Sequence, residues 1–152
     1  MRGGALFECG PDGADVQVVR ELARRVAPSI EWTPVALDNK PKLLRECGLW
    51  ARKLLDTGCE RVLIVWDLYP AWREDGMKPD CVVDRQVIEA NLRSSGVTLA
   101  DVRLLCIAEE LEAWLIADGR ALSAVLSTPA HPCKIGHQKR PEQIKNPNPD
   151  NS

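Results

Sequence analysis

The sequence predicts an α/β fold in which helices cover both faces of a mostly parallel sheet of about four strands. Segments with strand character and segments with helix character alternate four times along the chain. That order is typical of parallel strands joined by helical crossovers. The run Val62-Leu63-Ile64-Val65-Trp66 is continuously apolar, as expected for a central parallel strand that is buried on both faces.

The predicted strands are short apolar segments that end at turn residues. They comprise residues 5–9, 30–37, 61–66 and 102–108. The first strand ends in the turn cluster Gly10-Pro11-Asp12-Gly13, whose composition is a strong turn signal. Pro34 lies within the second strand. Because proline has no N–H to donate to a ladder, the second strand is expected at an edge of the sheet.

The predicted helices carry apolar residues at helical spacing. They comprise residues 14–26, 42–57, 82–95, 109–117 and 121–126. Pro28 lies just beyond the first helix, Gly58 follows the second and Gly96 follows the third. Proline or glycine just past the last helical residue is a common stop signal, so these three boundaries are the best marked.

Composition divides the chain into an α/β domain over residues 1–126 and a proline-rich basic tail over residues 127–152. The tail holds five prolines among asparagine, aspartate and lysine residues, a composition that cannot build a core. It is therefore expected to be extended or disordered.

Charge and cysteine content limit the possible function classes. The net charge is −2 and the isoelectric point about 5.7, so the chain as a whole does not attract nucleic acid by its charge. No apolar run approaches the ~20 residues of a membrane span, and no export signal is expected at the N-terminus. The six cysteines show no Cys-x-x-Cys spacing. In the absence of an export signal they are expected to be reduced thiols of a cytoplasmic protein. The lack of a long apolar run predicts that the protein has no membrane partner.

Acidic residues stand where two of the apolar strands end. Glu8 follows Gly4-Ala5-Leu6-Phe7, and Asp67 follows the Val62–Trp66 run. Ligands of open α/β sheets gather outside the carboxyl ends of the strands, so both carboxylates are candidates for one crevice and for a hydrated divalent cation. The alternative is that Glu8 is a solvated strand end and Asp67 an acid that caps a turn.

Further candidates lie in the later part of the chain. Glu109 and Glu112 are three residues apart on one face of a predicted helix, where they could reach the same crevice or simply favour the helix N-terminus. Lys134, Lys139 and Arg140 are candidate nucleic-acid contacts in the basic tail. The alternative for these three is a solvated tail.

Three segments resemble the TOPRIM domains of topoisomerases, primases and OLD-family nucleases. They are Phe7-Glu8-Cys9-Gly10-Pro11-Asp12, Val65-Trp66-Asp67 and the run from Ala108 to Asp118, which contains Glu-Leu-Glu-Ala-Trp. The last run most closely resembles a family of small uncharacterised bacterial TOPRIM-like proteins. The resemblance implies a TOPRIM/Rossmann-like fold over most of the chain.

The resemblance also implies an activity. Glu8, Asp67 and Glu112 would be catalytic and metal-binding residues of a nuclease that uses Mg²⁺ or Mn²⁺, acting in phage defence with a partner ATPase. Tyr69 stands where the motif expects a second aspartate, and Asp75, Asp80 and Asp84 are candidates to replace it. The alternative function is a non-catalytic TOPRIM-like module that binds a partner protein or nucleic acid.

Overall fold

The protein is an α/β structure built on a four-stranded, all-parallel sheet, which confirms the predicted fold class. The computed structural model describes residues 1–68, 79–108 and 118–136. The chain forms two compact units, Met1–Ala108 and Glu109–Ser152, and the sheet belongs to the first. The predicted helix over 109–117 lies outside the described residues.

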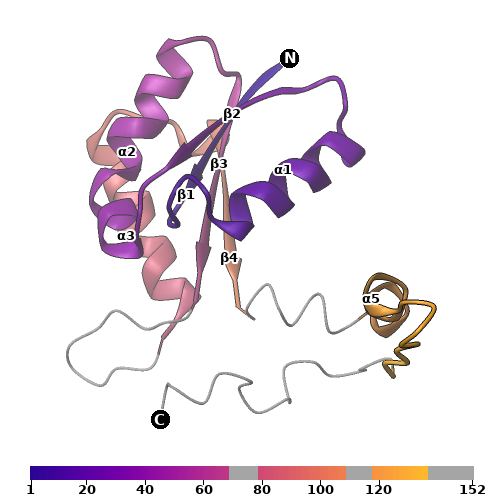
Figure 1. Cartoon of the computed structure of the whole chain (residues 1–152). Helices are drawn as coiled ribbons and strands as arrows, with labels where there is room; N and C mark the ends of the chain where they lie inside the picture. Colours follow the sequence, from indigo (N-terminus) through magenta and orange to yellow (C-terminus); the bar gives the residue numbers. More distant parts are fainter. Residues whose placement is uncertain (69–78, 109–117, 137–152) are drawn as a thin grey trace. The chain divides into compact units, whose positions relative to one another are not determined.

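The four strands are ordered β2-β1-β3-β4, so that the first and third strands of the sequence lie side by side at the centre (Figure 1). They are β1 (Arg2–Phe7), β2 (Glu31–Ala36), β3 (Arg61–Asp67) and β4 (Val102–Ile107). Phe7 pairs with Val65 in the register of β1 and β3. The strand that contains Pro34 is an edge strand, as predicted.

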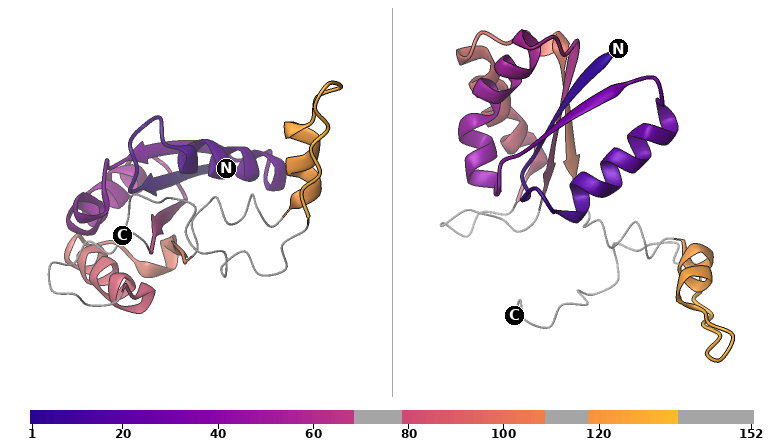
Figure 2. Two further views of the ribbon diagram at one scale, coloured as in Figure 1. Left: turned by 60° about the horizontal axis from the view of Figure 1, so that its bottom comes forward. Right: turned by 45° about the horizontal axis from the view of Figure 1, so that its top comes forward.

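Helices cover both faces of the sheet, as predicted. Helix α1 (Ala14–Val26) lies on one face, and helices α2 (Lys40–Asp56) and α3 (Cys81–Ser94) lie together on the other (Figures 1 and 2). The 3-10 turn η1 (Leu99–Asp101) leads into β4. The observed helix bounds lie within two residues of the bounds predicted for these three helices.

The larger core lies between the sheet and helices α2 and α3. It contains Leu6, Ile64 and Trp66 from the strands and Leu43 and Ile88 from the helices, and all five are fully buried. Burial of each such side chain stabilises the fold by about 1.5–3 kcal/mol. A smaller core against α1 is made by the opposite faces of the same strands, which explains why β3 is continuously apolar from Val62 to Trp66.

Two side-chain caps fix the first turns of α2 and α3. The Asn39 side chain accepts a hydrogen bond from the backbone N–H of Lys42, and the Asp80 side chain accepts one from Val82. Caps of this kind typically stabilise a helix by about 1 kcal/mol. Because a helix that links two parallel strands begins at their carboxyl end, both capped turns lie at the edge of the sheet where the candidate acids are found.

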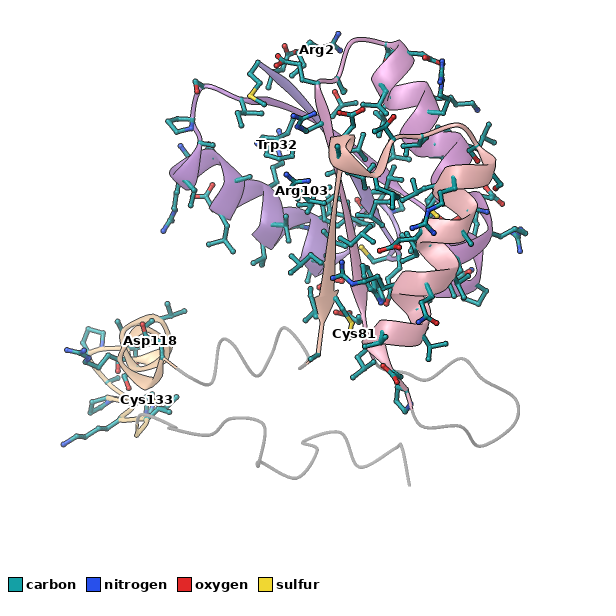
Figure 3. The ribbon with its side chains drawn as sticks, turned by 180° about the vertical axis from the view of Figure 1, so that it is seen from behind. Arg2, Trp32, Cys81, Arg103, Asp118 and Cys133 are labelled. Carbon is teal, nitrogen blue, oxygen red and sulfur yellow. A yellow bond between two sulfur atoms is a disulfide. The ribbon has the colours of Figure 1, made fainter. Side chains whose placement is uncertain are left out.

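The second unit contains helix α5 (Gly119–Leu126), whose N-terminus is capped by the Asp118 side chain (Figure 3). Residues 127–136 contain neither helix nor strand. The Ser127 hydroxyl donates to the carbonyl of Cys133 and accepts from its N–H. The predicted boundary between residues 126 and 127 stays a prediction, as does the conformation of the tail beyond residue 136.

A disulfide joins Cys81, the first residue of α3, to Cys106 on β4 (Figure 3). The prediction of six reduced thiols was therefore wrong for these two cysteines. The packing of α3 against the sheet brings their Cα atoms to 6.0 Å, a separation that a disulfide can bridge. The other four cysteines, Cys9, Cys47, Cys59 and Cys133, are free.

Candidate functional site

Glu8 and Asp67 lie together at the carboxyl ends of β1 and β3, the two central strands. Glu8 directly follows β1, and Asp67 is the last residue of β3. The backbone N–H of Asp67 donates a hydrogen bond to the Glu8 carboxylate. The prediction that the two acids occupy neighbouring strand ends is therefore confirmed, whereas their roles in catalysis and metal binding stay predictions.

The environment of Glu8 disfavours its charged form. The pKa of Glu8 is raised from 4.5 to about 7. Burial is the main cause of this rise, and repulsion from the carboxylates of Asp67 and Asp15 contributes to it. The hydrogen bond from Asp67 N–H and attraction by Lys40 oppose the rise without cancelling it. Among the described residues, the Glu8 Oε2 atom is buried and has no hydrogen-bond partner. This carboxyl can therefore hold or release a proton near neutral pH.

The turn after Glu8 depends on Gly13. A Cβ atom at this position would lie 2.6 Å from Sγ of Cys9, which is closer than van der Waals contact. The N–H of Gly13 donates to the carbonyl of Gly10 at 2.9 Å and closes the turn. Burial raises the pKa of the Cys9 thiol to about 11. Cys9 therefore stays protonated at neutral pH and serves as packing rather than as a thiolate nucleophile.

A buried ion pair lies beside the two acids. Nζ of Lys40 lies 2.7 Å from Oδ2 of Asp84, and each side chain is about 5% exposed or less. The same ammonium donates to the backbone carbonyls of Asp67 at 3.0 Å and Leu68 at 3.2 Å. The first turns of α2 and α3 are thus joined to the end of β3.

Sequence reasoning missed the role of Lys40. A lysine directly after an asparagine cap resembles an ordinary exposed helix start, and no local pattern distinguishes it from Lys42, which is partly exposed and pairs with Asp38. The only available signal was the coincidence of one lysine and one aspartate, each at the start of a helix that follows a strand end. That signal does not reveal which residues meet.

The candidates for a third acidic ligand have other roles or lie outside the described residues. Asp80 caps α3, and Asp84 is bound to Lys40. Asp75, Tyr69, Glu109 and Glu112 lie outside the described residues, as do Lys139 and Arg140. Lys134 is exposed in the second unit, which agrees equally with a phosphate contact and with a solvated side chain.

The donor set partly fits a divalent cation. Within residues 1–68, 79–108 and 118–136, no group of three or more His, Cys, Asp or Glu side chains could hold a metal ion. Glu8 and Asp67 nevertheless form a two-carboxylate arrangement, and Mg²⁺ often takes one or two protein carboxylates with water completing its coordination. The buried Oε2 atom of Glu8 is the chemical feature that a cation would satisfy.

Comparisons with protein-family models, with curated proteins and with solved structures gave no match to this chain. The TOPRIM-like relationship therefore stays a prediction that rests on the three sequence segments and agrees with the parallel α/β fold. No helix in the described part of the chain is long and apolar enough to cross a bilayer.

Proposed function

We propose that this protein cleaves phosphodiester bonds of nucleic acid with the help of Mg²⁺ or Mn²⁺ at the carboxyl ends of β1 and β3. The observation that carries the proposal is the Glu8–Asp67 pair: a half-buried carboxyl with a pKa raised to about 7, held by the N–H of Asp67. A carboxyl whose pKa is raised by burial beside a second carboxylate is typical of acid–base sites.

The two acids have different roles in this proposal. Glu8 transfers the proton, because a group whose pKa lies near the working pH serves equally well as acid and as base. Asp67 supplies a carboxylate ligand at the end of the buried strand β3. A cation bound here would stabilise charge on the phosphoryl oxygens and lower the pKa of a bound water.

The wider role belongs to the same proposal. The resemblance of the Glu-Leu-Glu-Ala-Trp run supports Glu112 as a further acidic site residue, a partner ATPase, and action against foreign nucleic acid such as that of phage. Lys134, Lys139 and Arg140 would contact the phosphates of the substrate.

Charge-removing variants test the proposal. Glu8→Gln and Asp67→Asn keep the shape of each side chain, and each should lower Mg²⁺-dependent cleavage of labelled DNA or RNA by ~10² or more. Asp56→Asn is the matched control, because Asp56 is an exposed acid at the far end of α2, paired with Arg52. Cleavage that survives in Glu8→Gln and Asp67→Asn at the control's rate would exclude this site.

A non-catalytic binding module is the second candidate function. The observation that favours it is the ammonium of Lys40, which already supplies positive charge beside Glu8 and Asp67. Two acids with a neighbouring lysine can form a stable strand end without metal. If the wild-type protein binds no Mn²⁺ and cuts neither DNA nor RNA, but retains nucleic acid or a partner protein, the second candidate is the correct one.

A further inference from the structure

We propose that Lys40 is a positioning residue, which fixes the end of β3 so that Asp67 is held against Glu8. This inference rests on the proposed function for its catalytic meaning, although the contacts that support it belong to the fold. Lys40 does not need to touch a substrate in order to act in this way. It acts through the backbone of Asp67, the last residue of β3, and of Leu68, the residue that follows.

The bonding of the Lys40 ammonium supports positioning rather than ligand binding. An ammonium group has three N–H donors. Nζ has three oxygen acceptors in the structure: Oδ2 of Asp84 at 2.7 Å and the carbonyls of Asp67 and Leu68 at 3.0 and 3.2 Å. Its three donors are therefore used within the protein. The side chain is also buried, so that it does not present charge to a passing phosphate.

The position of the two carbonyls shows what the ammonium holds. Strand β3 ends at Asp67, and the N–H of Leu68 still donates to the carbonyl of Ile107 on β4 at 2.8 Å. The β3–β4 register ends with Asp67 opposite Ile107. Lys40 therefore binds the backbone at the carboxyl end of β3 and at the residue that follows it.

Asp84 and its helix complete the arrangement. Asp84 lies in the first turn of α3, which is fixed by the Asp80 cap and, through Cys81, by the disulfide to β4. The turn before α2 is fixed to β1, because the N–H of Leu37 donates to the carbonyl of Phe7 and the N–H of Asp38 donates to that of Cys9. Lys40 thus connects the loop after β1, where Glu8 lies, to the end of β3, where Asp67 lies.

The inference predicts a local effect that a general loss of packing would not give. In Lys40→Met, hydrogen exchange of the Asp67 and Leu68 amides should speed up at least 10-fold more than that of Ile64 in the same strand. In the double variant Lys40→Met/Asp84→Leu, the buried charges are replaced by apolar groups, an exchange that often leaves stability unchanged. The double variant should therefore fold, yet show the same local loss of protection.

Mn²⁺ binding gives the second measurement. With Mn²⁺ alone as the probe, followed by electron paramagnetic resonance, the affinity of the double variant should fall about 10-fold. Lys40→Arg should recover part of that affinity, because it keeps the charge and the donors. Lys42→Met is the matched control: Lys42 lies two residues further along α2, and its pair with Asp38 is partly exposed.

The outcomes separate this inference from the proposed function. Wild-type exchange rates at Asp67 and Leu68 in the folded double variant would overturn the positioning role, whatever the protein binds. Local loss of protection in a protein whose wild type binds no Mn²⁺ and cuts no nucleic acid would support the positioning role and overturn the proposed function. Mn²⁺ affinity that falls equally in Lys42→Met would show that the loss is not specific to Lys40, and would also overturn the inference.

Discussion

Asp84 and Glu8 are two acids at the same edge of the sheet, and their surroundings are opposite. Asp84 is buried and meets the ammonium of Lys40 at 2.7 Å. Glu8 is less buried, yet its burial, together with repulsion from the carboxylate of Asp67, raises its pKa to about 7. A deeply buried acid can thus be the better stabilised one when a cation is in direct contact.

This contrast indicates which acid is structural and which is available for chemistry. The Asp84–Lys40 pair also has backbone partners, so that its charges are satisfied within the fold. Glu8 keeps one buried oxygen without a hydrogen-bond partner among the described residues. A polar atom of that kind costs stability unless a ligand, a proton or water satisfies it. Four changes would break or sharpen the comparison.

The largest effect is expected where the satisfied pair is broken. Lys40→Met leaves the Asp84 carboxylate buried without its cation and removes a donor from the carbonyls of Asp67 and Leu68. Loss of one partner of a buried ion pair typically costs about 3–5 kcal/mol. Urea unfolding should show this loss in Lys40→Met and a much smaller one in Lys40→Met/Asp84→Leu. Equal losses in the two variants would contradict the assignment of the pair.

The second effect concerns the disulfide that fixes the first turn of α3. Cys81 and Cys106 are 25 residues apart in the sequence, and a cross-link that closes a loop of this length stabilises a fold by about 3 kcal/mol. The double variant Cys81→Ser/Cys106→Ser should lose about that much in urea unfolding. Dithiothreitol should destabilise the wild type similarly and leave the double variant unchanged. A wild type that is insensitive to the reductant would contradict the prediction.

Local patterns along the chain were sufficient to predict the framework of the fold. The apolar run before Asp67 indicated a central strand, and β3 is central and buried. Pro34 indicated an edge strand, and β2 lies at an edge. Because the carboxyl ends of parallel strands meet at one edge of the sheet, the two strand-end positions alone predicted that Glu8 and Asp67 lie close together.

Contacts between distant segments could not be predicted in the same way. Lys40 and Asp84 begin two different helices, and their meeting depends on how α2 and α3 pack together on one face of the sheet. The pairing of Cys81 with Cys106 depends on the same packing, and the absence of a spacing motif concealed it. The rise in the pKa of Glu8 follows from burial, which a strand-end position does not determine.

The third effect is a gain of stability in the Glu8→Gln variant, and its size depends on pH. Because folding raises the pKa of Glu8 from 4.5 to about 7, the folded state favours the protonated acid. Stability from this group is complete below pH 4.5 and is lost as the pH rises through 7. At pH 8 the free energy of unfolding of Glu8→Gln should therefore exceed that of the wild type by about 1–2 kcal/mol, after allowance for screening by solvent.

The difference should nearly vanish at pH 4, where Glu8 is protonated in both states. Urea unfolding of both proteins at the two pH values, in the presence of EDTA, gives the measurement. A chelator is needed because a bound cation would itself favour the charged carboxylate. A wild type that is as stable as Glu8→Gln at pH 8 would show that Glu8 is well satisfied after all, and the contrast with Asp84 would disappear.

The smallest effect is expected at Lys42. Its comparison with Lys40 distinguishes the effect of burying an ion pair from the effect of forming one. Its ammonium lies 2.7 Å from Oδ2 of Asp38, the same distance that separates Lys40 from Asp84. The pair is partly exposed, however, with side chains 34% and 55% accessible, and water screens such charges. Lys42→Met should therefore lower the free energy of unfolding far less than Lys40→Met does. A loss at Lys42 as large as that at Lys40 would mean that distance alone sets the strength of these pairs. The buried lysine would then have no special role in positioning the end of β3.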